Sequence, residues 1–236
     1  MSRREGGGRV PEPSRTDPVT LEGHRKVVEM ITAKLPAESF LMLLGGGLMM
    51  EAGLRHAVTT KDEDLVLLLV EGEGLRVADA AALERLIREL GSTPKVRKDQ
   101  TNVSCALDTS EGTFLVEFVR GRRGGHGYFI SRAVLERVAE ISRRDGRLLV
   151  PPLEALAFLK AWASVDKAKL VATGRDGRGY HAERQRAFRR DVALIRERVL
   201  ESRAPDAGVF TKLLEACSQN RARAVRQVLE EAGWNV

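Results

Sequence analysis

Residues 40–70 read FLMLLGGGLMMEAGLRHAVTTKDEDLVLLLV, and this stretch decides the fold that we expect. The apolar run Phe40–Leu44 predicts a buried strand, because it is short, continuous and followed by glycines. A turn at which the backbone can approach a ligand closely is predicted by those glycines, Gly45, Gly46 and Gly47. Residues 48–54 then predict a short helix, against whose N-terminus a phosphate can rest.

Two carboxylates, Asp62 and Asp64, stand at alternate positions where a second apolar strand begins. Strand side chains repeat every two residues, so we expect both carboxylates on one face and Glu63 on the other. Hard oxygen ligands so placed suit Mg²⁺. Acidic residues at a strand entry are usually solvated, and a glycine run is usually a flexible turn. Their combination, at adjacent ends of two consecutive strands, predicts a phosphate cradle beside a metal site.

The common nucleotide-binding motifs do not fit this stretch. No Gly-Lys-Ser or Gly-Lys-Thr follows the glycines, and G-x-G-x-x-G is absent. The residues instead resemble the nucleotidyltransferase superfamily with the polymerase-β-like fold, and within it the AbiEii/AbiGii toxin family with its MenT-like members. The signature is a Gly-Gly turn, a short helix, and then an arginine, a threonine and an Asp-x-Asp pair, here Gly46-Gly47, Arg55, Thr60, Asp62 and Asp64.

Two later segments carry the resemblance further. PPLEALAFLKAWA, Pro151–Ala163, resembles the family's helix after the core, with Lys160 as its lysine. RQRAFRRDVALI, Arg184–Ile195, resembles the later basic-Asp motif, with Asp191 as its carboxylate. The chain departs from the pattern at the turn, where a third glycine replaces the frequent serine, and at Leu194, which stands near the place of a second aspartate.

The resemblance implies an α+β fold: a polymerase-β-like core, with a mixed sheet flanked by helices, and a helical C-terminal lobe. It implies Mg²⁺ or Mn²⁺ as the cofactor, held by Asp62 and Asp64. It places the triphosphate of an NTP at the glycines and Thr60, with Lys160 contacting phosphate. Lysine on this apolar helix can instead extend its ammonium to water. Asp191 either orients Lys160 or the nucleotide, or belongs to a surface ion pair.

Glu117 interrupts the apolar strand TFLVEFV. Such an acid is either on a solvated face or directed at the same site as Asp62 and Asp64. Polymerase-β-like enzymes commonly carry a third carboxylate on such a strand, so the resemblance implies that Glu117 is the third metal ligand.

Composition changes along the chain predict three parts. Residues 1–17, rich in Arg, Gly and Pro, are expected to be a disordered leader. Residues 18–150 form the expected core, which continues with a helix over 78–90 and a hairpin of strands 103–107 and 113–119. Residues 151–236 form the expected helical lobe, with helices over 153–164, 182–202, 208–218 and 222–232.

The 236 residues are 43% hydrophobic, enough to bury a substantial core. The sequence shows neither an apolar stretch of membrane-spanning length nor a signal peptide, so we expect a cytoplasmic protein without a membrane partner. Two distant cysteines and four scattered histidines argue against a disulfide framework or a zinc motif.

The formal net charge is +6, which favours a polyanionic partner. Arginines that we expect to bind RNA gather on one predicted helix, at Arg184, Arg186, Arg189 and Arg190. The leading interpretation is a toxin that transfers a nucleotide to tRNA or another RNA, with a possible cognate antitoxin. A small-molecule nucleotidyltransferase of the antibiotic-modifying kind and a non-catalytic nucleotide-binding relative are the alternatives.

Overall fold

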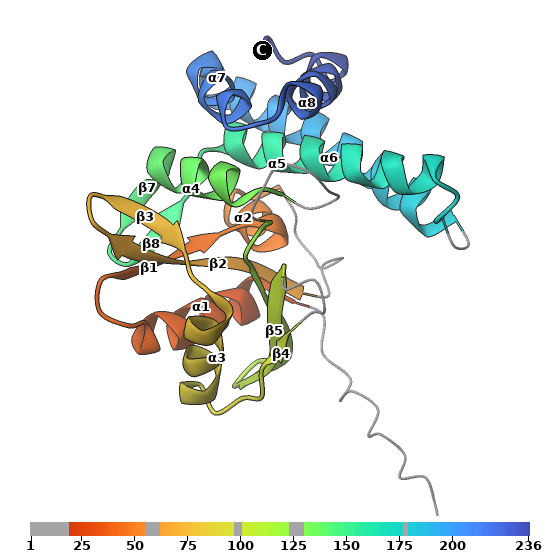
Figure 1. Ribbon diagram of the computed structural model, residues 1–236. Coiled ribbons are helices and arrows are strands. Elements are labelled where there is room, and N and C mark those ends of the chain that lie inside the picture. Colours follow the sequence, from red (N-terminus) through yellow and green to blue (C-terminus); the bar gives the residue numbers. More distant parts are fainter. Residues whose placement is uncertain (1–18, 55–61, 97–100, 123–129, 177–178) are drawn as a thin grey trace, which may run out of the picture.

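The computed structural model describes residues 19–54, 62–96, 101–122, 130–176 and 179–236, with the backbone alone at Asp62. The fold is α+β, a mixed sheet flanked by helices (Figure 1). The described strands are β1 (Ser39–Leu43), β2 (Asp62–Glu71), β3 (Gly74–Val77), β4 (Lys95–Val96), β5 (Asn102–Thr109), β6 (Gly112–Val119), β7 (Arg143–Asp145) and β8 (Leu148–Val150). The described helices are α1 (Leu21–Lys34), α2 (Gly45–Glu51), α3 (Ala80–Glu89), α4 (Arg132–Ile141), α5 (Leu153–Ala172), α6 (Tyr180–Ser202), α7 (Ala207–Glu215) and α8 (Gln219–Glu231).

The sheet has the strand order β4-β5-β6-β2-β1-β8-β7, and β3 pairs with β2 off this path. β2 runs antiparallel to β1 but parallel to β6, and β1 runs parallel to β8. The central strand β2 is buried on both faces over Leu65–Leu68, which explains its continuous apolar sequence. Charged residues in β2 stand only at its two ends, Asp62, Glu63 and Asp64 at the start and Glu71 at the finish.

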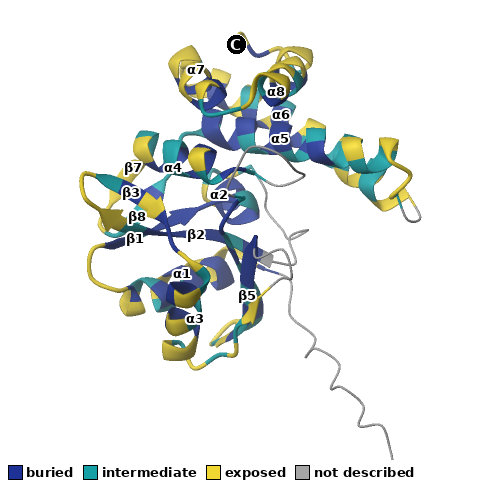
Figure 2. Cartoon of the chain, viewed as in Figure 1, coloured by how far each residue is buried: buried dark blue, intermediate teal, exposed yellow. Residues whose placement is uncertain are grey.

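Helices cover both faces of this sheet. Figure 1 shows α1 and α3 on one side and α4 with the C-terminal helices on the other. The dark blue of buried residues in Figure 2 runs through the sheet and along the inner faces of these helices. α2 lies at the end of β1 and contacts α1, β2 and α5. It therefore sits where the sheet, its covering helix and the C-terminal helices meet.

The C-terminal helices pack mainly around α5. α5 lies along α6 and also contacts α7 and α8, and its middle is buried on all sides. Phe210 of α7 and Trp234, which follows α8, make an edge-on ring contact, with their ring centroids 5.0 Å apart. The paired C-terminal end of α5 and N-terminal end of α6 project past α7 and α8 (Figure 1). None of the described helices combines the length and apolarity needed to cross a bilayer.

Most expected elements of the core are present at the expected positions. The first strand, the second strand, the 78–90 helix and the hairpin correspond to β1, β2, α3 and β5–β6, and the later helices to α5–α8. α5 is longer than expected and continues to Ala172. The expected leader, residues 1–17, lies outside the described residues.

One expectation about the glycines is wrong. The glycines do not form a turn ahead of a helix that begins at Leu48, because α2 itself begins at Gly45 and ends at Glu51. Gly46 and Gly47 are buried helical residues. Glycine destabilises a helix by about 1 kcal/mol relative to alanine, so the sequence pattern favoured a turn. Close packing around the backbone of α2 overrides this preference.

Candidate functional site

Asp64 and Glu117 are neighbours on the sheet. They are register partners in the parallel pair of β2 and β6, so their side chains leave the same face. Both residues are half-buried. The amide Nδ2 of Asn102, on the adjacent strand β5, donates a hydrogen bond of 3.0 Å to Glu117 Oε2. Glu117 is therefore held at a defined place beside Asp64 rather than on a remote solvated surface.

Asp62 begins β2 and is the register partner of Leu115. Its side chain lies outside the described part of the structure, so its expected alignment with Asp64 stays a prediction. Arg55 and Thr60, expected beside the nucleotide, also lie outside the described residues.

Gly45 lies directly against Asp64. Its φ is +54°, a conformation that side chains rarely adopt. A Cβ at this position would overlap Asp64 Oδ2 and lie 3.0 Å from Asp64 Cβ. The backbone fixes the same contact, because Leu44 N donates to Asp64 O at 3.1 Å. Only glycine lets the start of α2 approach the carboxylate this closely.

The donor set at Asp64 and Glu117 fits Mg²⁺ or Mn²⁺. Carboxylates at facing positions of neighbouring strands repel each other, and a cation between them relieves that repulsion. Mg²⁺ is commonly bound by one or two carboxylates together with substrate phosphates and water. Among the described side chains, no group of three His, Cys, Asp or Glu residues is arranged to hold a metal. A third protein ligand would therefore be a side chain that the structure does not describe. The sequence predicts Asp62 for this role.

A second polar cluster links the C-terminal helices. Lys160 Nζ of α5 and Asp191 Oδ2 of α6 lie 3.0 Å apart, and both residues are buried. Lys160 also lies over the ring of Phe188, 5.4 Å from its centroid. The lysine thus does not extend to water, and the aspartate is not part of a surface ion pair. α2 contacts both β2, which carries Asp64, and α5, which carries Lys160.

The four arginines expected to bind RNA are exposed on α6. Two of them already have partners within the chain: Arg189 forms an ion pair of 2.5 Å with Glu231, and Arg184 stacks over Phe188 at 5.0 Å. Arg186 and Arg190 show no ion pair to a described residue. Arg189 therefore links α6 to α8 and Arg184 packs on its own helix, which leaves Arg186 and Arg190 as the candidates for contact with a partner.

A buried histidine–glutamate pair next to the acidic residues escaped the sequence analysis. Glu63 is fully buried on the face of β2 opposite Asp64, as expected from the strand period, and lies 2.9 Å from His24 Nδ1 of α1. The two residues are 39 positions apart, so no local motif could have joined them. The one available signal was a charged residue at the start of a strand that is buried on both faces.

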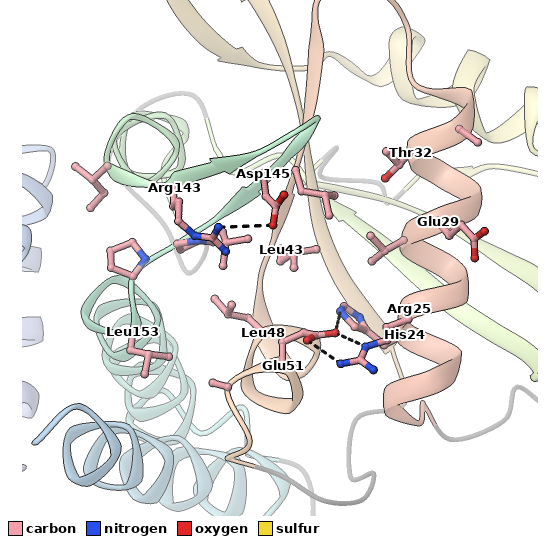
Figure 3. A pocket seen from close by; sticks show the side chains of 18 of the residues that line it. His24, Arg25, Glu29, Thr32, Leu43, Leu48, Glu51, Arg143, Asp145 and Leu153 are labelled. Atoms are coloured by element: carbon pink, nitrogen blue, oxygen red, sulfur yellow. Dashed lines mark hydrogen bonds and ion pairs between the residues drawn. The ribbon is translucent and has the colours of Figure 1, made fainter. Parts of the chain in front are cut away.

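A pocket of about 1160 Å³ opens beside His24, bounded by α1, α2, β7, β8 and the start of α5 (Figure 3). Its floor includes Leu43, Leu148 and Val150, and ion pairs of Arg25 with Glu51 and of Arg143 with Asp145 stand at its rim. Asp64, Glu117, Lys160 and Asp191 do not line it. The floor residues share the sheet face of Glu63, so the pocket and the carboxylate pair lie on opposite faces. Because the pocket is mostly apolar, we assign the candidate site to the carboxylates.

Comparisons of the chain with family models, with curated proteins and with solved structures found no significant match.

Proposed function

We propose that this protein is a metal-dependent nucleotidyltransferase, which moves a nucleoside monophosphate from an NTP to an acceptor hydroxyl. The observation that carries the proposal is the cluster of Asp64, Glu117 and Gly45. Two carboxylates meet there on one face of the sheet, and a glycine brings backbone against one of them. The order of motifs in the sequence, with its resemblance to the AbiEii/AbiGii toxin family, supports the same assignment.

In this proposal Asp64 and Glu117, together with Asp62, hold Mg²⁺ or Mn²⁺. The bound cation would lower the pKa of the acceptor hydroxyl and neutralise charge at the α-phosphate as pyrophosphate leaves. Asn102 orients Glu117 through its 3.0 Å hydrogen bond. Gly45 lets the start of α2 lie directly against Asp64, where a side chain would overlap the carboxylate.

Lys160 is assigned to the triphosphate. Its ammonium is desolvated and held by Asp191, and a buried cation interacts with a phosphate more strongly than a solvated one. Asp191 then acts as a positioning residue, because it fixes the ammonium without contacting the reacting atoms. This assignment requires a conformational adjustment that brings Lys160 to the phosphates.

The proposed acceptor is RNA, most simply a tRNA. Arg186 and Arg190 are exposed on α6, and the net charge of +6 attracts a polyanion. Aromatic residues make up only 5% of the chain, which favours recognition through backbone phosphates and shape over base stacking. A toxin role with a cognate antitoxin is implied by the family resemblance alone and is part of the proposal on that basis.

The experiment is incubation of the purified protein with each labelled NTP in turn, Mg²⁺ and total RNA. We expect one NTP to label one RNA class, and EDTA to abolish the label. Labelling of a small acceptor but not of RNA would support the antibiotic-modifying alternative. NTP binding without transfer to any acceptor would support a non-catalytic relative, and absence of both would contradict the proposal.

A further inference from the structure

The acidic segment of β2 contains a third carboxylate, Glu63, which points away from the candidate site. It is fully buried, and its Oε2 lies 2.9 Å from His24 Nδ1. The distance is that of a hydrogen bond, in which one partner donates and the other accepts. The other oxygen, Oε1, has no hydrogen-bond partner among the described residues. Burying a carboxylate in this way is costly, and a packed apolar pair of similar volume is often no less stable.

The start of α2 packs against His24 and Glu63. A Cβ at Gly47 would lie 2.5 Å from His24 Cε1 and 2.6 Å from Glu63 Oε2. Two residues earlier, Gly45 is in the equivalent close contact with Asp64. The first turn of α2 is therefore fixed from both sides of β2, by Asp64 on one face and by His24 with Glu63 on the other.

The C-terminal end of α2 contacts α1, the helix that carries His24. Glu51 accepts a hydrogen bond of 2.9 Å from Arg25 Nε, and its Oε1 lies 4.0 Å from His24 Nε2 (Figure 3). Hydrogen bonding from Arg25 lowers the pKa of Glu51, so this carboxylate remains ionised at neutral pH. His24 thus contacts both the first turn and the last residue of α2, while Glu63 ties it to the strand of Asp64.

We propose that the His24–Glu63 pair is a positioning element that sets the glycine segment of α2 relative to Asp64, and so sets the geometry of the nucleotide site. This inference rests on the proposed function. It explains why a fully buried carboxylate stands next to Asp64 at a place where an apolar side chain would be less costly. It also explains why glycine is needed at position 47, since a side chain there would separate α2 from the pair.

The test compares two substitutions of His24. His24→Asn can keep an N–H donor near the position of Nδ1, whereas His24→Leu leaves Glu63 without it. Leu213→Ala is the matched control, because Leu213 is fully buried in α7, which has no side chain in the candidate site. Each variant is measured for kcat and for KM of the NTP, and for amide hydrogen exchange at residues 45–51 without nucleotide.

We expect His24→Leu to lower kcat/KM by about 100-fold, since a displacement of roughly 1 Å has that effect on a positioned site. Most of the loss should be in KM for the NTP, and exchange at residues 45–51 should accelerate. His24→Asn should stay within about tenfold of wild type and Leu213→Ala within about threefold, the latter despite a lower Tm. Wild-type kcat/KM in His24→Leu, or equal losses in His24→Asn and His24→Leu, would overturn the inference.

If His24→Leu does not fold, Gly47→Ala takes its place, because its methyl group pushes against His24 while both polar partners remain. The same loss of kcat/KM is expected, and wild-type activity in Gly47→Ala would overturn the inference. If the wild-type protein transfers no nucleotide, the proposed function fails, and the pair is judged by exchange alone. Exchange at residues 45–51 that is no faster in His24→Leu than in Leu213→Ala would then overturn it.

Discussion

Asp64 of β2 faces Glu117 of β6 across a parallel strand pair, which sets two carboxylates side by side on one face of the sheet. Among the described elements, β3, α3, β4 and β5 stand between these two strands in the sequence. Facing like charges on neighbouring strands cost free energy unless something between them compensates. Under the proposed function, a divalent cation with phosphate ligands supplies that compensation.

Replacing Gly45 with alanine should lower the transfer activity, whereas replacing Gly72 with alanine should not. Both have positive φ, +54° and +61°, so alanine should destabilise each by about 1–2 kcal/mol. A methyl group at Gly45 would overlap the Asp64 carboxylate, whereas one at Gly72 would meet no described atom within 4 Å. We expect Gly45→Ala to lose most of its transfer activity and Gly72→Ala to keep it. Equal activity in the two variants would show that close approach to Asp64 is not needed.

The contribution of the Lys160–Asp191 pair to stability should be separable from its contribution to nucleotide transfer. Either Lys160→Ala or Asp191→Ala alone leaves a buried charge unpaired and should cost about 3–5 kcal/mol in urea unfolding. The double variant Lys160→Met/Asp191→Leu should recover most of that stability, because both charges are gone, and yet transfer no nucleotide. A double variant that is stable and fully active would reduce the pair to a structural role.

Acceptor binding should depend on Arg186 and Arg190. If each contacts an RNA phosphate, the double Arg→Gln variant should bind RNA more weakly and its log–log salt dependence should be shallower by about 1–2 units. The control replaces Arg137, which is half-buried on α4, and Arg143, which is exposed on β7, and should leave the slope unchanged. NTP affinity should be the same in all three proteins. Identical slopes for the two double variants would argue against an RNA site on α6.

Asp166 should make stability depend on pH. Burial raises its pKa to about 7 from 3.8, against the opposing effect of Arg221, whose Nη1 lies 2.6 Å from Asp166 Oδ1. Between about pH 4 and pH 7 the native state holds a proton that the unfolded chain has released. This contribution to stability is therefore lost as pH rises through that window, by at most about 1.4 kcal/mol per pH unit.

The measurement is urea unfolding of wild type and of Asp166→Asn at pH 5 and pH 8. The asparagine stays neutral, so the wild-type protein should lose more stability than the variant between these two pH values. The same change in both proteins would contradict the assignment of this titration to Asp166.

Local patterns predicted the parts of the core that are locally determined. The strand, helix and strand of residues 40–70 follow from apolar runs, and the hairpin of β5 and β6 follows from alternation around a turn. The sequence resemblance, rather than periodicity, brought Glu117 to the site of Asp64. Asp64 and Glu117 lie side by side because β2 pairs with β6. Such a pairing between distant strands cannot be predicted from any short segment of the sequence.

Some of the elements that were not predicted depend on distant partners, and others carry visible local signals. α5 continues past Ser164 because Asp166 pairs with Arg221 of α8, which local sequence shows only as a polar helix end. α1 and α4 were not predicted, although side chains that cap them, Thr20 and Ser131, were visible signals. The short β7–β8 hairpin was marked by Asp145-Gly146, a common turn pair. Gly45 and Gly47 are part of α2 despite their low helix propensity. Their contacts with Asp64, His24 and Glu63 leave no space for a side chain.

The most direct test of the central claim is Mg²⁺-dependent transfer of label from NTP to RNA by wild type and by Asp64→Asn, with Glu117→Gln in parallel. Each substitution keeps the shape of the side chain and removes one anionic donor. We predict that both variants keep their Tm in EDTA, because a carboxylate repulsion is relieved, while transfer falls by at least about 100-fold. Transfer at the wild-type rate by folded Asp64→Asn would contradict the assignment of this site.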